Sequence, residues 1–470
     1  MKRKIVISTL LNQVQVGIVE GRRLAEYYLE RDCDERLGGN VYKGLVENVL
    51  PGMGAAFVDI GMPKNAFLFL ADAVGDVKKG DTVMVQVSKE AAGTKGPRVT
   101  AKISLPGRYL VLMPAQDHTG VSRKIGDSEE RLRLKEIAEE IRPPGCGLIV
   151  RTVAEGRTKA ELQDDLSDLL HDWDKIMDKF RSKSSTRLLY QDYDLVHRIL
   201  RDMYVTDETS VVVDCPKMQR RVQKELADLG VAEAKVDLYE GKVDLFTCLG
   251  LDKELERAGQ NRVWLDCGGY LVFNQTEALL SIDVNTGKYV GSKNLQDTVL
   301  KTNLQAAAEI AHQLRLRNYG GIVIIDFIDM TDPNNREAVL EQLADSLRAD
   351  KTRTNLLGFT RLGLVELTRK RTDRLLSHMM EVDCPHCKGR GRVISDAALA
   401  FRIAKEVSSL ARETAEAVTV RCHPAVAGLL IGPKKSNLRA LEEHTGRSVT
   451  VKGDDSLARQ DYQIQSGSTD

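Results

Sequence analysis

Two stretches, LLSIDVNTG at 279–287 and GIVIIDFIDM at 321–330, predict both the type of fold and the position of the candidate reactive side chains. In each stretch an apolar run ends in an aspartate, Asp283 in the first and Asp326 in the second. Short runs rich in Ile and Val are typical of strands buried inside a parallel sheet. If these two strands are neighbours, both carboxylates converge at one edge of the sheet.

Carboxylates at such an edge favour magnesium, which takes one or two protein carboxylates and keeps several water molecules. Asn285 and Asp329 follow closely in the sequence and are further candidates for the same site. The alternative is that each aspartate only caps the loop that follows its strand. Two aspartates in matching contexts of strand, loop and helix favour the metal site.

The chain around these strands alternates between strand and helix patterns. Residues 293–318 and 336–348 carry apolar side chains at helical spacing, so we expect an α/β layer from residue 261 onward. A second, small α/β unit is expected at 397–470. The fold class is therefore mixed, α+β and α/β, with several domains.

The first hundred residues instead show short β-branched runs separated by Gly and Pro-Gly turns, which predicts a small antiparallel barrel over residues 37–103. Phe57 and Phe67 lie on two of its strands, and Lys95 lies in a loop. Aromatic faces beside a cation suit single-stranded nucleic acid. Either phenylalanine taken alone is more often a core residue.

Two charged segments stand out. A helix expected from Lys159 to Lys179 carries seven carboxylates, Asp165 among them, which we assign to a solvated outer face that repels nucleic acid. Residues 351–374 hold seven basic residues against two acidic ones, so this segment is the clearest candidate for binding a polyanion.

The sequence CPHCKGRGRV contains Cys384 and Cys387, which form half of a tetrahedral zinc site. The missing ligands can come from the same chain, as Cys422 with His423 or as His378 with His386. They can also come from the same two cysteines of a second copy across a two-fold axis. An unmetallated or redox pair is the alternative, but we expect no thioredoxin-like βαβ pattern around it.

Length and composition exclude several other classes. The 470 residues have 68 basic and 68 acidic side chains, so polyanion binding must come from local patches. No apolar stretch is long enough to span a membrane, and the scattered cysteines fit a reducing cytoplasm. Ile282 and Tyr289 stand where a P-loop requires glycine and Ser or Thr, so we reject an ATPase.

Four motifs in order resemble the bacterial ribonuclease E/G family. The sequence GLVENVLPGMGAAFVDIG at 44–61 is similar to its S1-type OB-fold, and IVRTVAEG at 149–156 to its sensor for RNA 5′ ends. SIDVNTG and IDFIDM resemble its catalytic aspartates, and CPHCKGRG its zinc-link. The similarity spans nearly the whole chain.

The resemblance implies a particular set of domains. An RNase H-like core is interrupted by the OB-fold and the 5′ sensor, and a DNase I-like catalytic region, a zinc-link and a small domain follow. The implied boundaries are RNase H-like 1–36 and 197–258, OB-fold 37–103, sensor 104–196, catalytic 259–381, zinc-link 382–396 and small domain 397–470.

The resemblance also implies roles for single residues. Asp283 and Asp326 bind magnesium and Asn285 orients their site, while Phe57, Phe67 and Lys95 hold single-stranded RNA. Cys384 and Cys387 bind a zinc ion shared between two protomers. The pocket for a 5′-monophosphate matches Gly107, Val111, Arg151, Thr152 and Arg353.

The implied activity is magnesium-dependent cleavage of single-stranded RNA, in rRNA maturation and mRNA decay, by a cytoplasmic homodimer or larger homo-oligomer. Cleavage is expected to leave 5′-phosphate and 3′-hydroxyl ends and to be stimulated by a 5′-monophosphate. A scaffold for a degradosome is not implied. The rival from another class is a non-catalytic RNA-binding or ribosome-associated factor. Another alternative treats Arg151 and Arg353 as surface arginines that pair with the acidic helix.

Overall fold

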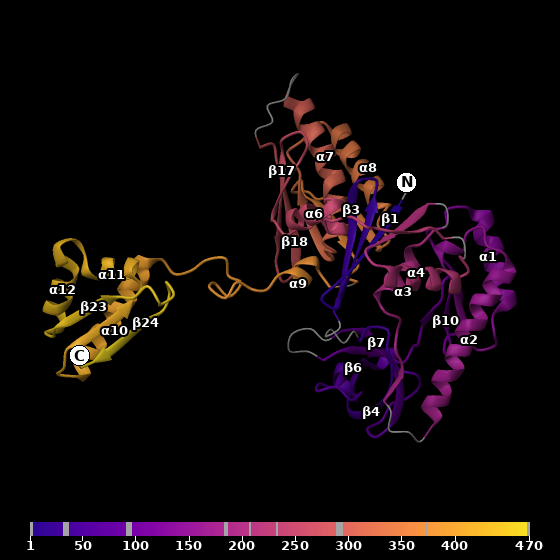
Figure 1. Ribbon diagram of the computed structural model, residues 1–470, viewed down its shortest axis with the longest axis horizontal. Helices are drawn as coiled ribbons and strands as arrows, with labels where there is room; N and C mark the ends of the chain where they lie inside the picture. Colours follow the sequence, from indigo (N-terminus) through magenta and orange to yellow (C-terminus); the bar gives the residue numbers. More distant parts are fainter. Residues whose placement is uncertain are drawn as a thin grey trace. The chain divides into compact units, whose positions relative to one another are not determined.

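The computed structural model describes residues 3–31, 37–90, 96–182, 187–205, 208–231, 234–287, 295–372 and 374–467 (Figure 1). The chain divides into two compact units, Met1–Met379 and Met380–Asp470. Among the described residues, unit 1 contains four sheets and unit 2 contains a fifth, so the chain is a mixed α/β protein of several domains.

The first sheet combines strands from distant parts of unit 1 in the order β15-β14-β1-β2-β3. β1 pairs in parallel with β14, so that Ile5 lies opposite Val211, and in antiparallel with β2. Alternate residues of β1 enter two cores, one with α3 and α4 and the other with α5 and α6. The elements are β1 (Arg3–Leu10), β2 (Gln13–Glu20), β3 (Arg23–Arg31), β14 (Thr209–Val213), β15 (Val236–Leu238), α3 (Leu195–Met203), α4 (Pro216–Asp228), α5 (Leu245–Cys248) and α6 (Leu251–Ala258).

The expected barrel is present as a five-stranded, OB-like barrel that closes where β4 pairs with β7. A sixth strand, β13 (Leu188–Tyr190), extends it by pairing with β4. Gly44 is required in this barrel, because a Cβ there would lie 2.4 Å from Cγ1 of Val58. The barrel strands are β4 (Val41–Leu50), β5 (Ala55–Asp59), β6 (Ala66–Phe69), β7 (Thr82–Lys89) and β8 (Arg98–Thr100).

A small sheet in the order β11-β12-β10-β9 follows the barrel and shares a core with α1 and α2. The expected acidic helix is α2, which begins in a capping box formed by Thr158 and Glu161. The elements are β9 (Leu105–Pro106), β10 (Leu110–Met113), β11 (Thr119–Val121), β12 (Gly147–Val150), α1 (Ser128–Ile141) and α2 (Lys159–Arg181).

The expected α/β layer is a six-stranded sheet in the order β16-β17-β18-β19-β21-β20. Apolar side chains of α7 and α8 pack on one face of the sheet, and the two helices lie together in Figure 1. The other face carries exposed side chains such as Trp264 and Ile322. The elements are β16 (Arg262–Trp264), β17 (Tyr270–Gln275), β18 (Leu279–Asn285), β19 (Gly321–Asp326), β20 (Thr354–Phe359), β21 (Val365–Arg369), α7 (Leu295–Leu316), α8 (Pro333–Leu347) and α9 (Leu376–Met380).

Unit 2 is built on a three-stranded sheet in the order β23-β22-β24, packed against three helices. β22 and β23 are parallel and are joined through α11 and α12, which is a βαβ connection. The expectation that no such pattern accompanies the cysteine pair is therefore wrong. The elements are α10 (Asp396–Glu413), β22 (Val418–Cys422), α11 (Pro424–Ile431), α12 (Ser436–Thr445), β23 (Val449–Gly453) and β24 (Tyr462–Ser466).

No helix in the described part of the chain is both long and apolar enough to cross a membrane.

A buried ion-pair network joins α7 to the first sheet. The guanidinium of Arg315 donates to both oxygens of Glu20, at 2.8 and 3.0 Å, and to Glu26 at 2.7 Å. Burial alone would raise the pKa of Glu20, but Arg315 and Arg3 lower it below its ordinary value of 4.5. The network therefore links α7, which packs on the six-stranded sheet, to strands at the start of the chain.

We predict that Arg315→Ala lowers the free energy of unfolding by about 3–5 kcal/mol, because it removes the cation that the buried carboxylates of Glu20 and Glu26 share and leaves Glu20 with Arg3 alone. Urea unfolding measures this, with Arg348→Ala as control, since Arg348 is exposed and pairs with the exposed Asp345. Because the pKa of Glu20 is lowered, its contribution is present at neutral pH and is lost as the pH falls below 4.5. Equal stability of the two variants at pH 7 would contradict this role.

Candidate active site

Asp283 and Asp326 lie directly opposite each other on neighbouring parallel strands, β18 and β19. Ile282 and Val284 on β18, and Ile325 on β19, point into the core under the helices. Because side chains alternate along a strand, both aspartates point to the opposite, exposed face. The predicted convergence of the two carboxylates is therefore a feature of the structure.

The electrostatics of this pair suit a cation. Burial raises the pKa of Asp326, and the negative charges of Asp283 and Asp329 raise it further. The side-chain amide of Asn285 donates to Oδ2 of Asp283 at 2.8 Å, which orients that carboxylate. Two oxygen ligands with room for water fit magnesium, and a divalent ion would relieve the repulsion between them.

The barrel presents aromatic side chains outward. Phe57 lies opposite Phe67, their ring centroids are 5.9 Å apart, and both residues are half-buried, whereas their neighbours Ala56 and Leu68 fill the core. The alternative that the two phenylalanines are core residues is therefore wrong. Lys95 lies outside the described residues.

Two residues that the sequence did not single out extend this aromatic surface. The ring of Phe69 is 4.8 Å from that of Phe67, and the guanidinium of Arg98 lies 4.3 Å over the Phe69 ring. The alternation of residues along the run AFLFL places Phe69 on the same face as Phe67, so the sequence could have identified Phe69. The position of Arg98 depends on the parallel pairing of β8 with β6, which the sequence does not show.

The basic segment 351–374 is not one solvated patch. Arg369 is 3% exposed and forms an ion pair with the buried Asp350 at 2.6 Å. Arg371 donates to the backbone oxygen of Gly320, and Arg374 pairs with Glu90. Several of its cations therefore stabilise the fold, and Arg353 and Arg361 are exposed.

Four of the five residues assigned to the 5′-end pocket lie around β10 and β12. Arg151 donates to the backbone oxygen of Gly107 at 2.6 Å and pairs with Asp202 at 2.8 Å, and the hydroxyl of Thr152 lies 2.8 Å from that of Ser122. Val111 faces Ile149 across the two strands. Arg151 thus forms its ion pair with Asp202 of α3, while its charge also acts to lower the pKa of Asp165 on the acidic helix.

The fifth residue, Arg353, belongs to a segment that contacts this region. Nζ of Lys351 donates to the backbone oxygen of Asp202, and Nζ of Lys124 donates to that of Asp350, both at 2.8 Å. The first bond ties the segment before Arg353 to Asp202, which pairs with Arg151, and the second ties it to the loop before α1.

Asp165 was assigned to a solvated face, and that assignment is wrong. Its carboxylate accepts backbone N–H groups of Arg108, Tyr109 and Leu110 at 2.8–2.9 Å. Burial raises the pKa of Asp165, while these three donors act to lower it. A Cβ on Gly107 would lie 2.7 Å from the Asp165 carboxylate. Asp165 and Gly107 together therefore set the shape of the loop before Val111.

In unit 2, Cys384 and Cys387 lie in one tight turn. Backbone N–H groups of Cys387 and His386, together with the Cys387 side chain, lower the pKa of Cys384. The N–H of Gly391 donates to Sγ of Cys387 at 3.3 Å. The turn therefore favours the thiolate of Cys384, the form that binds metal.

One of the two same-chain ligand sets considered for this pair, Cys422 with His423, is engaged elsewhere in unit 2. Cys422 is fully buried in its core, and Nδ1 of His423 accepts the N–H of Ala425. Within the described ranges, no three or more His, Cys, Asp or Glu side chains are grouped to hold a metal.

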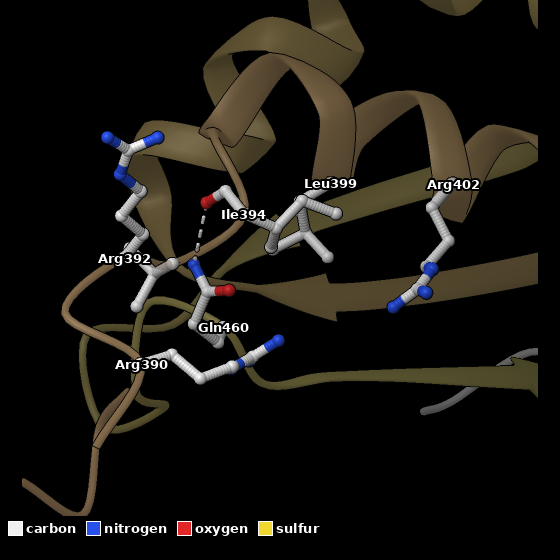
Figure 2. Close-up of a pocket in the computed structure, with 7 residues that line it drawn as sticks. Arg390, Arg392, Ile394, Leu399, Arg402 and Gln460 are labelled. Carbon is white, nitrogen blue, oxygen red and sulfur yellow. Dashed lines mark hydrogen bonds between the residues drawn. The ribbon is translucent and has the colours of Figure 1, made fainter. Parts of the chain in front are cut away.

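A cavity of about 610 Å³ in unit 2 contains none of the predicted site residues (Figure 2). Arg390 and Arg402 extend toward each other across an apolar wall that includes Ile394 and Leu399 (Figure 2). The amide of Gln460 donates to the backbone oxygen of Ile394 at 3.0 Å. The predicted catalytic residues, by contrast, lie on an exposed sheet face.

Comparison with known proteins shows the family of the chain. Residues 104–372 match the Ribonuclease E/G family. Ribonuclease G of Haemophilus influenzae is 38% identical over 485 residues, which cover 98% of this chain and 99% of that protein. Ribonuclease G of Escherichia coli K12 is 38% identical over 475 residues, covering 96% and 97%. The chain belongs to the ribonuclease E/G family.

As a member of the ribonuclease E/G family, the chain is an endoribonuclease. Ribonuclease E of Synechocystis is 40% identical over 374 residues, which cover 76% of this chain and 55% of that protein. Residues 383–467 match a second family description, RNase E/G, Thioredoxin-like domain. Unit 2 is therefore thioredoxin-like, in agreement with its βαβ connection and against the expectation from the sequence.

Proposed function

We propose that the protein is a magnesium-dependent endoribonuclease that cuts single-stranded RNA, using Asp283 and Asp326 to hold the metal. The observation that carries the proposal is the register of β18 and β19, which places the two carboxylates side by side on an exposed face. In an endoribonuclease, such a pair is the natural place for the metal.

Each residue of the site has a defined task. Asp283 and Asp326 hold the ion, and Asn285 fixes the direction of the Asp283 carboxylate through its 2.8 Å hydrogen bond. A bound magnesium ion acidifies water and neutralises charge on the scissile phosphate. Hydrolysis with the 3′ oxygen as leaving group gives 3′-hydroxyl and 5′-phosphate ends.

The substrate class follows from the barrel. The half-buried rings of Phe57, Phe67 and Phe69 offer stacking faces, which need bases that are not paired. Arg98 adds positive charge for the RNA backbone, as does Lys95, which the family resemblance assigns to RNA binding. We therefore propose single-stranded regions of cytoplasmic rRNA precursors and mRNA as substrates.

We assign the domains as the family resemblance suggests. The sheet formed by β1, β2, β3, β14 and β15 belongs to an RNase H-like core, which the barrel and the 5′ sensor interrupt. The sheet of β16–β21 forms the DNase I-like catalytic region, and residues 382–396 form the zinc-link.

We predict that Asp326→Asn lowers the cleavage rate more than about 100-fold, because it removes charge from the metal site. RNA binding stays near the wild-type level, since no stacking group is lost. Cleavage of a labelled single-stranded RNA with magnesium, and a binding titration, measure the two effects. Asp345→Asn is the control, because Asp345 is an exposed residue on α8. Near-normal turnover by folded Asp326→Asn would refute the assignment.

We further propose that Cys384 and Cys387 bind zinc together with the same cysteines of a second chain. Two thiolates per chain supply half of a tetrahedral site, so the zinc content should be about 0.5 per protomer. Cys384→Ala should lose zinc and lower the oligomeric mass, whereas Cys248→Ala, in unit 1, should change neither. Metal analysis and light scattering test this. One zinc per chain, with no change of mass on its removal, would instead indicate ligands in the same chain.

The third proposal concerns the RNA 5′ end. Arg151 still has N–H donors beyond those bonded to Gly107 and Asp202, and Thr152 has a hydroxyl, so both can bind a terminal phosphate with Arg353. We predict that a 5′-monophosphate RNA is cleaved faster than the same RNA with a 5′-triphosphate or a 5′-hydroxyl. A merely basic surface would favour the triphosphate.

Arg151→Ala and Arg353→Ala should remove this preference, while Lys135→Ala, which removes an exposed cation on α1, should keep it. Cleavage rates of one short oligonucleotide with the three 5′ ends decide the matter. Equal rates for all three ends in the wild type would exclude a 5′ sensor.

A further inference from the structure

Three side chains at one edge of the catalytic sheet form a compact cluster that has no role in the proposals above. Arg262 and Trp264 belong to the edge strand β16, and Tyr270 to its neighbour β17. The Arg262 guanidinium lies 4.5 Å over the Tyr270 ring, and the Trp264 and Tyr270 centroids are 5.2 Å apart. We call these three residues the β16 cluster.

The strand register places the β16 cluster on the same face as the aspartates. Arg262 lies opposite Val272, and Val272 lies opposite Asp283, so one row across the sheet runs from Arg262 to Asp326. In the next row on this face, Trp264 lies opposite Tyr270, and Tyr270 lies opposite Asn285. The residues between them on each strand point into the core.

The spacing between strands and along a strand gives the distance. Trp264 is two strands and two residues away from Asp283, which corresponds to about 12 Å between their Cα atoms. Tyr270 is nearer, because it is directly opposite Asn285. An RNA strand with its scissile phosphate at the aspartates can therefore reach the cluster with a nearby nucleotide.

The chemistry of the cluster matches an unpaired nucleotide. The chain has two tryptophans, and the side chain of one of them, Trp264, is 58% exposed. Tyr270 supports it from the side, and Arg262 stacks on Tyr270, so the group is held in place before any ligand binds. Exposed rings beside a guanidinium are what proteins use to stack bases and contact phosphates in single strands.

We propose that the β16 cluster binds an unpaired base of the RNA substrate on Trp264, close to the scissile phosphate, and that Arg262 contacts the adjoining phosphate. This inference rests on the proposed role of Asp283 and Asp326. It adds to the barrel a second stacking site, on the catalytic sheet itself.

The main alternative occupant is a second copy of the chain. Single exposed aromatic residues are common on protein surfaces, so the exposure of Trp264 does not by itself indicate an interface between copies. The position of Arg262 favours RNA as the occupant. Its guanidinium lies in the same row as the aspartates, so it offers positive charge to the phosphates of an RNA bound at the proposed metal site. Interfaces between copies are also enriched in Trp, Tyr and Arg, so the oligomeric mass is measured together with RNA binding.

The test compares how much RNA affinity is lost when one base of the RNA is removed with how much is lost when the Trp264 ring is removed. The probe is a set of ten-nucleotide single-stranded RNAs with a 5′-monophosphate, each lacking one base, bound to the full chain carrying Asp326→Asn so that the RNA stays intact. With Trp264 present, one abasic position near the cleavage site should weaken binding by between about 5-fold and about 150-fold. With Trp264→Ala, the intact RNA should already bind that much more weakly, and the same abasic position should add nothing.

Two further variants make the test specific. Trp264→Phe keeps a stacking ring and should retain most of the affinity. Leu357→Ala removes an exposed apolar side chain, 61% exposed, from β20 at the other edge of the sheet and should leave both affinity and abasic response unchanged.

The outcomes separate this inference from the proposed function. If the wild type cleaves RNA and the abasic response is the same with and without Trp264, the stacking site is refuted while the metal site stands. If Trp264→Ala lowers the oligomeric mass and leaves the abasic response unchanged, the surface is an interface between copies, and the inference is again refuted. If the coupling between Trp264 and one base is present but the wild type does not cleave, the stacking site stands and the proposed catalysis fails.

Discussion

The parallel pairing of β18 with β19 is the constraint on which the catalytic region depends. It places two carboxylates directly opposite each other, an arrangement that destabilises a sheet when both are charged. The register is held by Ile282 and Ile325, whose side chains are buried beneath α7 and α8. A slip of one residue would turn the aspartates into the core. The apolar residues therefore fix the positions of the two carboxylates, and a bound cation would offset the repulsion between them.

Much of this region was predictable because its signals are local. The two apolar runs, the helices at 293–318 and 336–348, and the alternation that turns Phe57 and Phe67 outward are all periodic patterns in the sequence. Each pattern needs only neighbouring residues to be recognised. The paired aspartates and the barrel were therefore found before the arrangement of the strands was known.

Other features escaped because they depend on contacts between distant residues. Asp165 binds backbone N–H groups more than fifty positions earlier, and backbone donors leave no trace in a sequence. Arg369 was counted with a basic surface, yet it is buried against Asp350, which only the antiparallel pairing of β21 brings about. Counting charged residues in a sequence does not distinguish a solvated cation from a cation that is buried in an ion pair. The thioredoxin-like character of unit 2 was missed for a similar reason, since the parallel pairing of its strands is not a local property.

The order in which the chain is synthesised has a consequence for the first sheet. β1 needs β14 as its parallel neighbour, yet the whole barrel lies between them in sequence. At about 5–20 residues per second, a ribosome takes about 10–40 s to make the residues that separate the two strands. The barrel can close in that time, because β4 to β8 pair among themselves. Until β14 has been synthesised as far as Val213, the backbone N–H and C=O groups on this edge of β1 have no partner strand. In a nascent chain, this edge must therefore be protected from pairing with other strands.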